Sequence, residues 1–399
     1  MERRTFLKAM AAGAGLGLRA FAGQMPDDLK ITRIVAFDLI SDRPKLIGKN
    51  SRLDVHGVQT RDRMVRLFTN TGLEGLGNCR AGQEQLGLLL GRHPLGYYRP
   101  LSRTMAGPLG AGTMPLWDLV GKIMGKPVYE LLGGVGSAIV PIYDGSLYFS
   151  DLLDEYHDNY LDRFRREIDM SWGMGHRAFK VKIGRGAKWM DPKEGYERDK
   201  EVVRSVREHV GPGAVMGVDA NDGYSLNQAA QLLVDLPGVD LAFMEEMFPE
   251  DIDKCLALKE FIRRRGLKAR IADGETQGDL EAFRPFIEAR AIDIFQGDMN
   301  HFGFEGILAA AAICKGVGAR IAPHNWGSLV GFYMQLHVGR AVANFYRAEH
   351  DAARTSVLAA DGYHIRDGYC SVPDAPGFGL SIYEPGFEKA AKIQFDLKA

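Results

Sequence analysis

The first third of the chain has the hydrophobic spacing of extended strands. Between residues 28 and 77 the apolar runs ITRIVAFDLI and MVRLFTNTGLEGLGN are bounded by turn-forming residues, which predicts a small antiparallel sheet. The next segment, GPLGAGTMPLWDLVGKIMGKPVYELLGG, repeats apolar residues at helical spacing until Gly125 and Pro127, so a helix is expected to end there. Residues 41–60, between the two strand-like runs, are polar and lack helical periodicity, a composition typical of a mobile loop.

From about residue 138 the spacing changes, and short apolar runs alternate with amphipathic helical segments. The predicted strands are AIVPIYD, RAFKVKIG, AVMGVDAN, LAFMEEM, ARIADGE, AIDIFQGD, ARIAPHN and AVANFYRAE. The helical segments between them include KEVVRSVREHV, LNQAAQLLVDL, CLALKEFIRRR, LEAFRPFIEA and FEGILAAAAICK. Because parallel strands need long crossovers, this alternation predicts a (β/α) barrel of the TIM type, with a doubly wound open sheet as the main competitor.

The positions of the chemically reactive side chains favour the barrel. From the second strand onward, each apolar run ends in one or two of these residues: Lys180, Lys182, Asp219, Glu245, Glu275, Asp298, His324 and Glu349. Barrel enzymes build their sites at the carboxyl ends of the strands, so these side chains are expected to meet at one mouth. The predicted fold is therefore a modified TIM-type α/β barrel, with an α+β capping domain formed by the N-terminal region and the C-terminal tail.

These patterns divide the chain into four segments. Residues 23–137 are predicted to form the capping domain, residues 138–355 the catalytic barrel, and residues 356–399 a segment that returns to the capping domain. Residues 1–22 contain paired arginines, then small and apolar residues and an Ala-Phe-Ala sequence, a pattern that resembles a twin-arginine export signal. An exported or periplasmic protein is expected, and a cytoplasmic protein with a frayed basic N-terminus is the alternative.

Composition and charge point to a small-molecule partner. The 399 residues are 46% hydrophobic and carry a formal net charge of −1 without long single-sign runs, which does not favour nucleic acid or an anionic membrane surface. After the leader, no apolar run approaches the roughly 20 residues that span a bilayer, so no membrane association of the mature form is expected. The cysteines form no CxxC pair and are predicted to be packed thiols: Cys79, Cys255, Cys314 and Cys370.

Three carboxylates end three successive predicted strands, about one strand-helix unit apart. Asp219, Glu245 and Glu275 would repel one another at a barrel mouth unless a cation lay between them. Hard oxygen ligands of this kind suit Mg²⁺ better than zinc. The alternative is three unrelated surface ion pairs, which is hard to reconcile with three consecutive units.

Two lysines occupy positions i and i+2 of one predicted strand, so their side chains should lie on the same side. Two close ammonium groups beside a divalent metal disfavour each other's charged form, and we expect this to lower the pKa of each. Lys182 is then a candidate general base and Lys180 the charge that tunes it. The alternative, if the KVK triplet is considered by itself, is that both lysines lie on a solvent-exposed face of the strand.

Asp298 and His324 end the sixth and seventh predicted strands, which a barrel makes adjacent. A carboxylate bound to one ring nitrogen fixes the tautomer of a histidine and raises the basicity of the other nitrogen. His324 is therefore a candidate second acid or base, although a histidine in such a sequence can also be purely structural.

The motifs AFKVKIG, GVDAN, FMEEM, ADGE, FQGD and APHNWGS, in this order, resemble the mandelate racemase and muconate lactonizing enzyme family of the enolase superfamily. The segment LWDLVGKIMGKPVYELLGG resembles the passage from capping domain to barrel in that family, so the resemblance covers nearly all of the chain after the leader. One departure is that Met247 and Phe248 separate Glu246 from Pro249, whereas the family has proline directly after the paired glutamates.

The resemblance implies a role for each candidate residue. It implies one Mg²⁺ ion on Asp219, Glu245 and Glu275, opposed bases at Lys182 and at His324 with Asp298, and a tuning charge at Lys180. It further implies that Asn221 lies near the metal and the substrate, that Glu349 is a catalytic carboxylic acid near the substrate carboxylate, and that Lys180 and Glu349 also bind the substrate.

The implied reaction is abstraction of the proton next to a substrate carboxylate, through an enediolate. Dehydration of an acid sugar to a 2-keto-3-deoxy acid is favoured; racemisation or epimerisation of a 2-hydroxy acid, cycloisomerisation of a lactone, and a non-catalytic binding barrel are the alternatives. The family habit also implies a homo-oligomer. The loop over residues 41–60 is expected to contact the distal end of the substrate, with Lys45, Lys49, Arg52 or His56 as candidate contacts.

Overall fold

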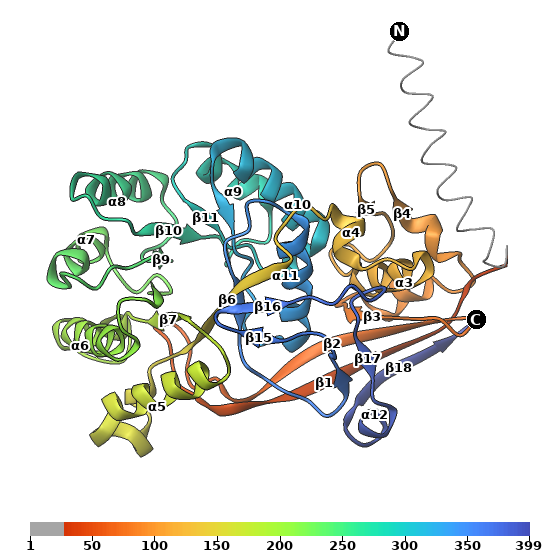
Figure 1. Cartoon of the computed structure of the whole chain (residues 1–399), viewed down its shortest axis with the longest axis horizontal. Helices are drawn as coiled ribbons and strands as arrows, with labels where there is room; N and C mark the ends of the chain where they lie inside the picture. The colour runs from red at the N-terminus through yellow and green to blue at the C-terminus, as the bar shows by residue number, and fades with distance from the viewer. Residues whose placement is uncertain (1–27) are drawn as a thin grey trace, which may run out of the picture.

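The computed structural model describes residues 28–399, in which a barrel is joined to a smaller sheet-and-helix layer (Figure 1). The predicted export signal, residues 1–22, lies outside the described residues. Within the described part of the chain, no helix has the length and apolar character needed to cross a bilayer.

The predicted antiparallel sheet is confirmed, and the C-terminal tail completes it. Strands β1 (Ile31–Ile47), β2 (Gly57–Thr69) and β3 (Glu74–Asn78) form a sheet with β18 (Lys392–Lys398), in the order β18-β1-β2-β3. Figure 1 shows β18, in blue, beside β1, although the two lie at opposite ends of the described chain. Helix α3 (Met114–Met124) contacts β3 and ends at Gly125, whose φ of 62° suits glycine. Smaller elements of this layer are α2 (Gln83–Gly87), β4 (Tyr98–Arg99), β5 (Thr104–Met105), α4 (Val128–Leu132), β14 (Leu358–Ala359), β17 (Ser381–Ile382) and α12 (Glu384–Ala390).

The prediction of one mobile loop over residues 41–60 is wrong for most of that segment. Strand β1 continues to Ile47 and β2 begins at Gly57, so only residues 48–56 connect them. The strand pattern was obscured because charged residues take the inward positions at the end of β1. Arg43 Nη2 lies 2.8 Å from Asp351 Oδ2, and Lys45 Nζ lies 2.5 Å from Glu167 Oε2, so both charges are neutralised inside the protein.

The eight predicted parallel strands are present and follow one another around a barrel. They are β6 (Ile139–Leu147), β7 (Ala178–Lys182), β8 (Val215–Asp219), β9 (Phe243–Glu245), β10 (Arg270–Asp273), β11 (Ile294–Phe295), β12 (Arg320–Ile321) and β13 (Ala348–His350). Strand β13 pairs with β6, and a parallel bridge from Ile321 to Phe345 joins β12 to the chain just before β13. The ring is therefore closed, which excludes the doubly wound open sheet.

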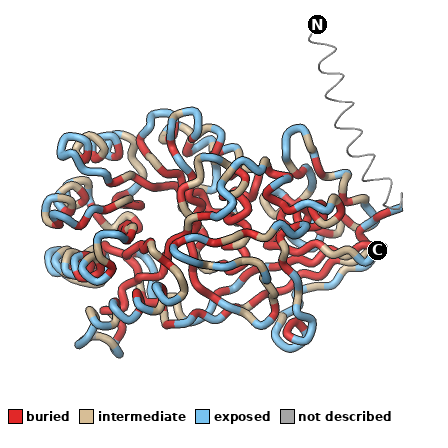
Figure 2. The backbone as a smooth tube through the Cα atoms, viewed as in Figure 1, coloured by how far each residue is buried: buried red, intermediate tan, exposed pale blue. Residues whose placement is uncertain are grey.

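Seven helices surround the strands, one on each connection from β6 to β13. They are α5 (Tyr160–Gly173), α6 (Pro192–Val210), α7 (Leu226–Asp235), α8 (Ile252–Arg264), α9 (Leu280–Glu288), α10 (Met299–Val317) and α11 (Leu329–Ala341). After β13 the chain forms the hairpin of β15 (Ile365–Arg366) and β16 (Tyr369–Ser371), which pairs with the edge of β6. The barrel is thus modified at its last unit. Figure 2 shows buried strands inside and exposed outer helix faces.

The four cysteines are buried and unpaired, as their wide separation predicted. Burial raises the pKa of the Cys314 thiol to about 12, so this thiol stays protonated and packs as an apolar group.

Candidate active site

The strand-end residues lie together in one cluster, which is buried except for the partly buried Glu275 and His324. Lys180 and Lys182 are on β7, Asp219 and Glu245 are the last residues of β8 and β9, and Glu349 is on β13. Glu275, Asp298 and His324 follow β10, β11 and β12 within a few residues. The barrel register therefore gathers side chains that are far apart in the sequence.

Asp219, Glu245 and Glu275 form a carboxylate triad whose ligand oxygens all lie within 4.8 Å of one another. Glu275 Oε2 is buried and has no hydrogen-bond partner among the described residues. Burial, followed by the charges of Asp219 and Glu275 and opposed by Lys180, holds the pKa of Glu245 well above its usual value. The protein's own groups thus leave an excess of buried negative charge and a buried carboxylate oxygen without a hydrogen bond, an arrangement that fits a divalent cation with oxygen ligands such as Mg²⁺.

The two adjacent glutamates occupy different places. Strand β9 ends at Glu245, and Glu246 has a φ of 39°, so the regular alternation of a strand stops between them. Glu246 is also buried, but its Oε2 accepts a hydrogen bond from Asn221 Nδ2 at 3.0 Å and it is not part of the triad. Both carboxylates therefore lie at the site, but only Glu245 belongs to the triad.

Lys180 is surrounded by carboxylates. Its Nζ lies 2.5 Å from Glu245 Oε1, 3.0 Å from Asp219 Oδ2 and 2.9 Å from Glu349 Oε1. Burial disfavours the ammonium form, but the charges of Glu245 and Glu349 outweigh burial and raise the pKa of Lys180 well above its usual value. The protein's own charges thus act against the predicted lowering, which for Lys180 would require the positive charge of a bound metal.

Lys182 is held at the edge of the triad. Its Nζ is hydrogen-bonded to Asp219 Oδ2, and it donates to Asn221 Oδ1 at 2.7 Å. Burial favours neutral Asp219, but Lys182 and Lys180 outweigh burial and lower the pKa of its carboxyl group. The amine is therefore placed between a carboxylate of the triad and a polar side chain.

His324 lies on the other side of the triad and pairs with Asp298 as predicted. Its Nδ1 donates to Asp298 Oδ2 at 2.7 Å, while its Nε2 lies 3.4 Å from Glu275 Oε2. Burial lowers the pKa of His324, but the Glu275 charge and the Asp298 hydrogen bond raise it to about 10. The protein's own groups thus keep the imidazole protonated at neutral pH, with Nε2 as the proton donor.

Asp298→Asn is expected to lower the pKa of His324, because it removes a carboxylate that stabilises the imidazolium. The wild-type imidazolium loses its proton as the pH rises through about 10, and the variant should lose it at a lower pH. NMR titration of the His324 ring resonances, in buffer with a chelator, measures both values. An equal or higher pKa in the variant would contradict the pairing.

Other polar groups hold the cluster in place, and sequence reasoning missed them. Gln296 Nε2 donates to Glu245 Oε2 at 2.6 Å, and the Gln335 side chain exchanges hydrogen bonds with the backbone of Glu349. Gln296 stands two residues before Asp298, and this spacing after a predicted strand was the available signal.

An aromatic wall stands beside Lys182. Tyr148 and Trp326 stack with ring centroids 4.6 Å apart, and Lys182 Nζ lies 5.1 Å from the Tyr148 ring. Trp326 Nε1 donates to His56 Nδ1 at 3.1 Å, and burial lowers the pKa of His56 to about 4. His56 is thus a neutral member of this wall.

The other three residues predicted to contact the distal end of the substrate interact with other groups of the protein. Lys45 is bound to Glu167 and to the carbonyl of Ser146, Lys49 lies over the Trp189 ring, and Arg52 pairs with Asp222. Of the four candidates, only His56 lies beside the residues that flank Lys182.

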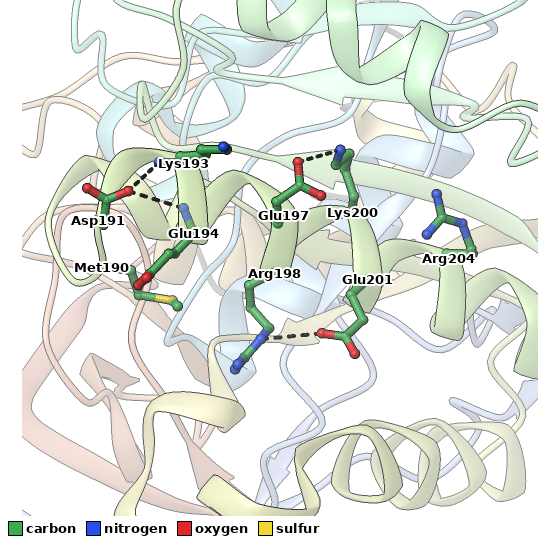
Figure 3. Close-up of a pocket in the computed structure, with 9 residues that line it drawn as sticks. All are labelled: Met190, Asp191, Lys193, Glu194, Glu197, Arg198, Lys200, Glu201 and Arg204. Atoms are coloured by element: carbon green, nitrogen blue, oxygen red, sulfur yellow. Dashed lines mark hydrogen bonds and ion pairs between the residues drawn. The ribbon is translucent and has the colours of Figure 1, made fainter.

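A second concavity, on the outer face of α6, is separate from this cluster (Figure 3). Its charged side chains pair with one another along the helix, as in Lys200 Nζ to Glu197 Oε1 at 2.8 Å and Arg198 Nε to Glu201 Oε2 at 3.5 Å. It contains none of the predicted site residues.

Comparison with known proteins finds a matching family and similar relatives. Residues 163–385 match the family model of enolase C-terminal domain-like proteins. The chain is 30% identical over 282 residues to D-galactarolactone cycloisomerase of Agrobacterium fabrum, covering 67% of this chain and 69% of the relative.

Two solved structures are also similar. Galacturonate dehydratase from Geobacillus sp., complexed with D-galacturonate and 5-keto-4-deoxy-D-galacturonate, is 30% identical with a TM-score of 0.83, over 93% of this chain and all of that one. A mandelate racemase/muconate lactonizing protein from Geobacillus sp. Y412MC10, complexed with magnesium and tartrate, is 31% identical with a TM-score of 0.84, over 92% of this chain and 97% of that one.

Proposed function

Because the chain belongs to the mandelate racemase and muconate lactonizing enzyme family of the enolase superfamily, we propose that it is a Mg²⁺-dependent dehydratase of an acid sugar. The observation that carries this proposal is a carboxylate triad with an amine on one side and an aspartate-paired imidazole on the other. The similar galacturonate dehydratase supports water loss as the reaction.

Asp219, Glu245 and Glu275 are the residues that would hold the metal. Bound Mg²⁺ supplies positive charge that stabilises the negative charge developing on the substrate carboxylate when the α-proton leaves. The ammonium group of Lys180, fixed by three carboxylates, adds a permanent positive charge at the same end of the site.

The remaining chemistry belongs to Lys182 and His324. Lys182 Nζ accepts the α-proton, and His324 Nε2 donates its proton to the hydroxyl group on the next carbon. The carbon–oxygen bond then breaks, water leaves, and the enol product tautomerises to a 2-keto-3-deoxy acid. The charged imidazole described above suits the acid role, and Asp298 keeps Nε2 directed to the site.

A panel of mono- and diacid sugars, incubated with Mg²⁺ in deuterated water, tests the proposal. Release of an α-keto acid that stops when the metal is chelated is expected for at least one substrate. Exchange of the α-proton without keto-acid release would indicate a racemase or epimerase instead. Neither exchange nor release with any substrate would favour a binding protein.

Cycloisomerisation is the second candidate, because the Agrobacterium relative is a D-galactarolactone cycloisomerase. A lactone substrate would be isomerised without loss of water, so its product keeps the mass of the substrate. Mass spectrometry of reactions with acid-sugar lactones separates the two activities.

We further propose that the protein is exported and forms a homo-oligomer. Export rests on the Arg3-Arg4 pair and the Ala20-Phe21-Ala22 sequence, and oligomerisation rests on the family resemblance. N-terminal sequencing of the protein from a periplasmic fraction should begin at Gly23, and light scattering should give a mass above 44.0 kDa.

A further inference from the structure

Ser51 makes one of the contacts that dock the connection between β1 and β2 on the barrel. Ser51 is 4% exposed, and its Oγ lies 2.6 Å from the carbonyl oxygen of Ala220 and 2.9 Å from that of Asn221. Its one hydroxyl proton is therefore shared between the two carbonyls that directly follow β8. The contact spans 169 residues of sequence and joins the capping layer to the barrel mouth.

Two glycines make the socket for this side chain. A Cβ atom on Gly184 or on Gly223 would lie 3.0 Å from Ser51 Cβ and within 2.9 Å of the Ala220 carbonyl oxygen. Gly184 also has a φ of +101°, which glycine adopts without strain. The space between these two glycines and the Ala220 carbonyl therefore accommodates a serine side chain but not a much larger one.

The turn that Ser51 contacts carries several groups of the active site. Asn221 has a φ of 40°, a left-handed conformation that neighbouring contacts must hold. Its backbone N–H donates to Asp219 Oδ1 at 2.9 Å, its Oδ1 accepts from Lys182 at 2.7 Å, and its Nδ2 donates to Glu275 Oε1 at 3.3 Å. A shift of this turn would move a metal ligand and the base together.

We propose that Ser51 is a positioning residue, which fixes the strained Ala220–Asn221 turn and through it the orientation of Asp219 and Lys182. The expected effect of Ser51 on kcat rests on the proposed function. Its expected effect on Mg²⁺ affinity can be measured without a substrate.

Ser51→Ala removes the hydroxyl and keeps the volume of the socket. We expect Mg²⁺ affinity and kcat each to fall about tenfold, as for the loss of one buried hydrogen bond, with KM changed less. Calorimetric titration with Mg²⁺ measures the first effect, and steady-state kinetics on the substrate found in the panel measure the second.

Trp189→Phe is the matched control. Trp189 Nε1 donates to the carbonyl of Asn50 at 2.6 Å, so this variant removes a different contact of the same loop without touching the turn at Asn221. A residue that merely anchors the loop would give equal effects in both variants, whereas a positioning residue predicts that Trp189→Phe keeps wild-type kcat and Mg²⁺ affinity. Equal Mg²⁺ affinity of Ser51→Ala and wild type, or equal losses in the two variants, would overturn the inference.

If thermal melting shows that Ser51→Ala does not fold, Gly223→Ala serves as a second variant, because it perturbs the same contact from the barrel side. The added Cβ should displace both Ser51 and the Ala220 carbonyl oxygen and so weaken Mg²⁺ binding. Unchanged Mg²⁺ affinity in this variant would also count against the inference. A wild-type protein that binds no Mg²⁺ refutes the proposed function and the inference together. A wild type that binds Mg²⁺ but converts no acid sugar refutes only the proposed function.

Discussion

Lys182→Ala is expected to lower kcat by about 10³-fold or more, the range lost when a positioned general base is removed. The side chain contacts Asp219 and Asn221 inside the site, and Lys180 still lies 3.0 Å from Asp219 in its absence. One cation therefore remains to neutralise Asp219, and the fold should be retained. Initial rates of keto-acid release at saturating Mg²⁺ measure the loss, and circular dichroism checks the fold.

Lys268→Ala is the control, because Lys268 is exposed and stands just before β10, at the opposite end of the barrel from the site. It should turn over at the wild-type rate. Near-normal turnover by Lys182→Ala would remove the amine from the mechanism. His324→Asn provides the complementary result, since loss of the acid should stop water release while Lys182 still exchanges the α-proton with deuterated water.

Glu245→Gln is expected to weaken Mg²⁺ binding more than about 100-fold, beyond the loss typical for a residue that only supports a ligand. Glu245 belongs to the triad, and its neutral replacement removes one of three anionic ligands. Glu246→Gln should weaken binding by about 10- to 100-fold, because Glu246 reaches the site through Asn221. Calorimetry with Mg²⁺ compares the two adjacent positions directly.

Glu260→Gln controls for the lost charge, because the ion pairs of Glu260 within residues 28–399 are with the exposed Arg263 and Arg264 on α8. It should bind Mg²⁺ as the wild type does. If Glu246→Gln lost more affinity than Glu245→Gln, the ligand would be the second glutamate of the pair, and the departure from the family pattern at Met247 would mark a changed metal site.

The parts of this protein that could be predicted are those that depend on neighbours in the chain. Alternating strands and helices give the barrel because each strand and its crossover form a local unit, and Lys180, Asp219 and Glu245 were found because each lies at or near the end of an apolar run. The helix end at Gly125 was likewise visible in a few adjacent residues. The spacing of apolar residues along the chain is visible in a single sequence, so these elements can be predicted from it.

The remaining features depend on which distant segments meet. Arg43 and Asp351 are 308 residues apart, and without its partner Arg43 looks like a loop residue. The raised pKa of Lys180 requires three carboxylates from three strands, and the place of Ser51 requires the capping layer to reach β8. Electrostatic energy and hydrogen bonding act through space over a few ångströms, whatever the separation along the chain, so their balance is set only when the barrel closes and the two layers dock.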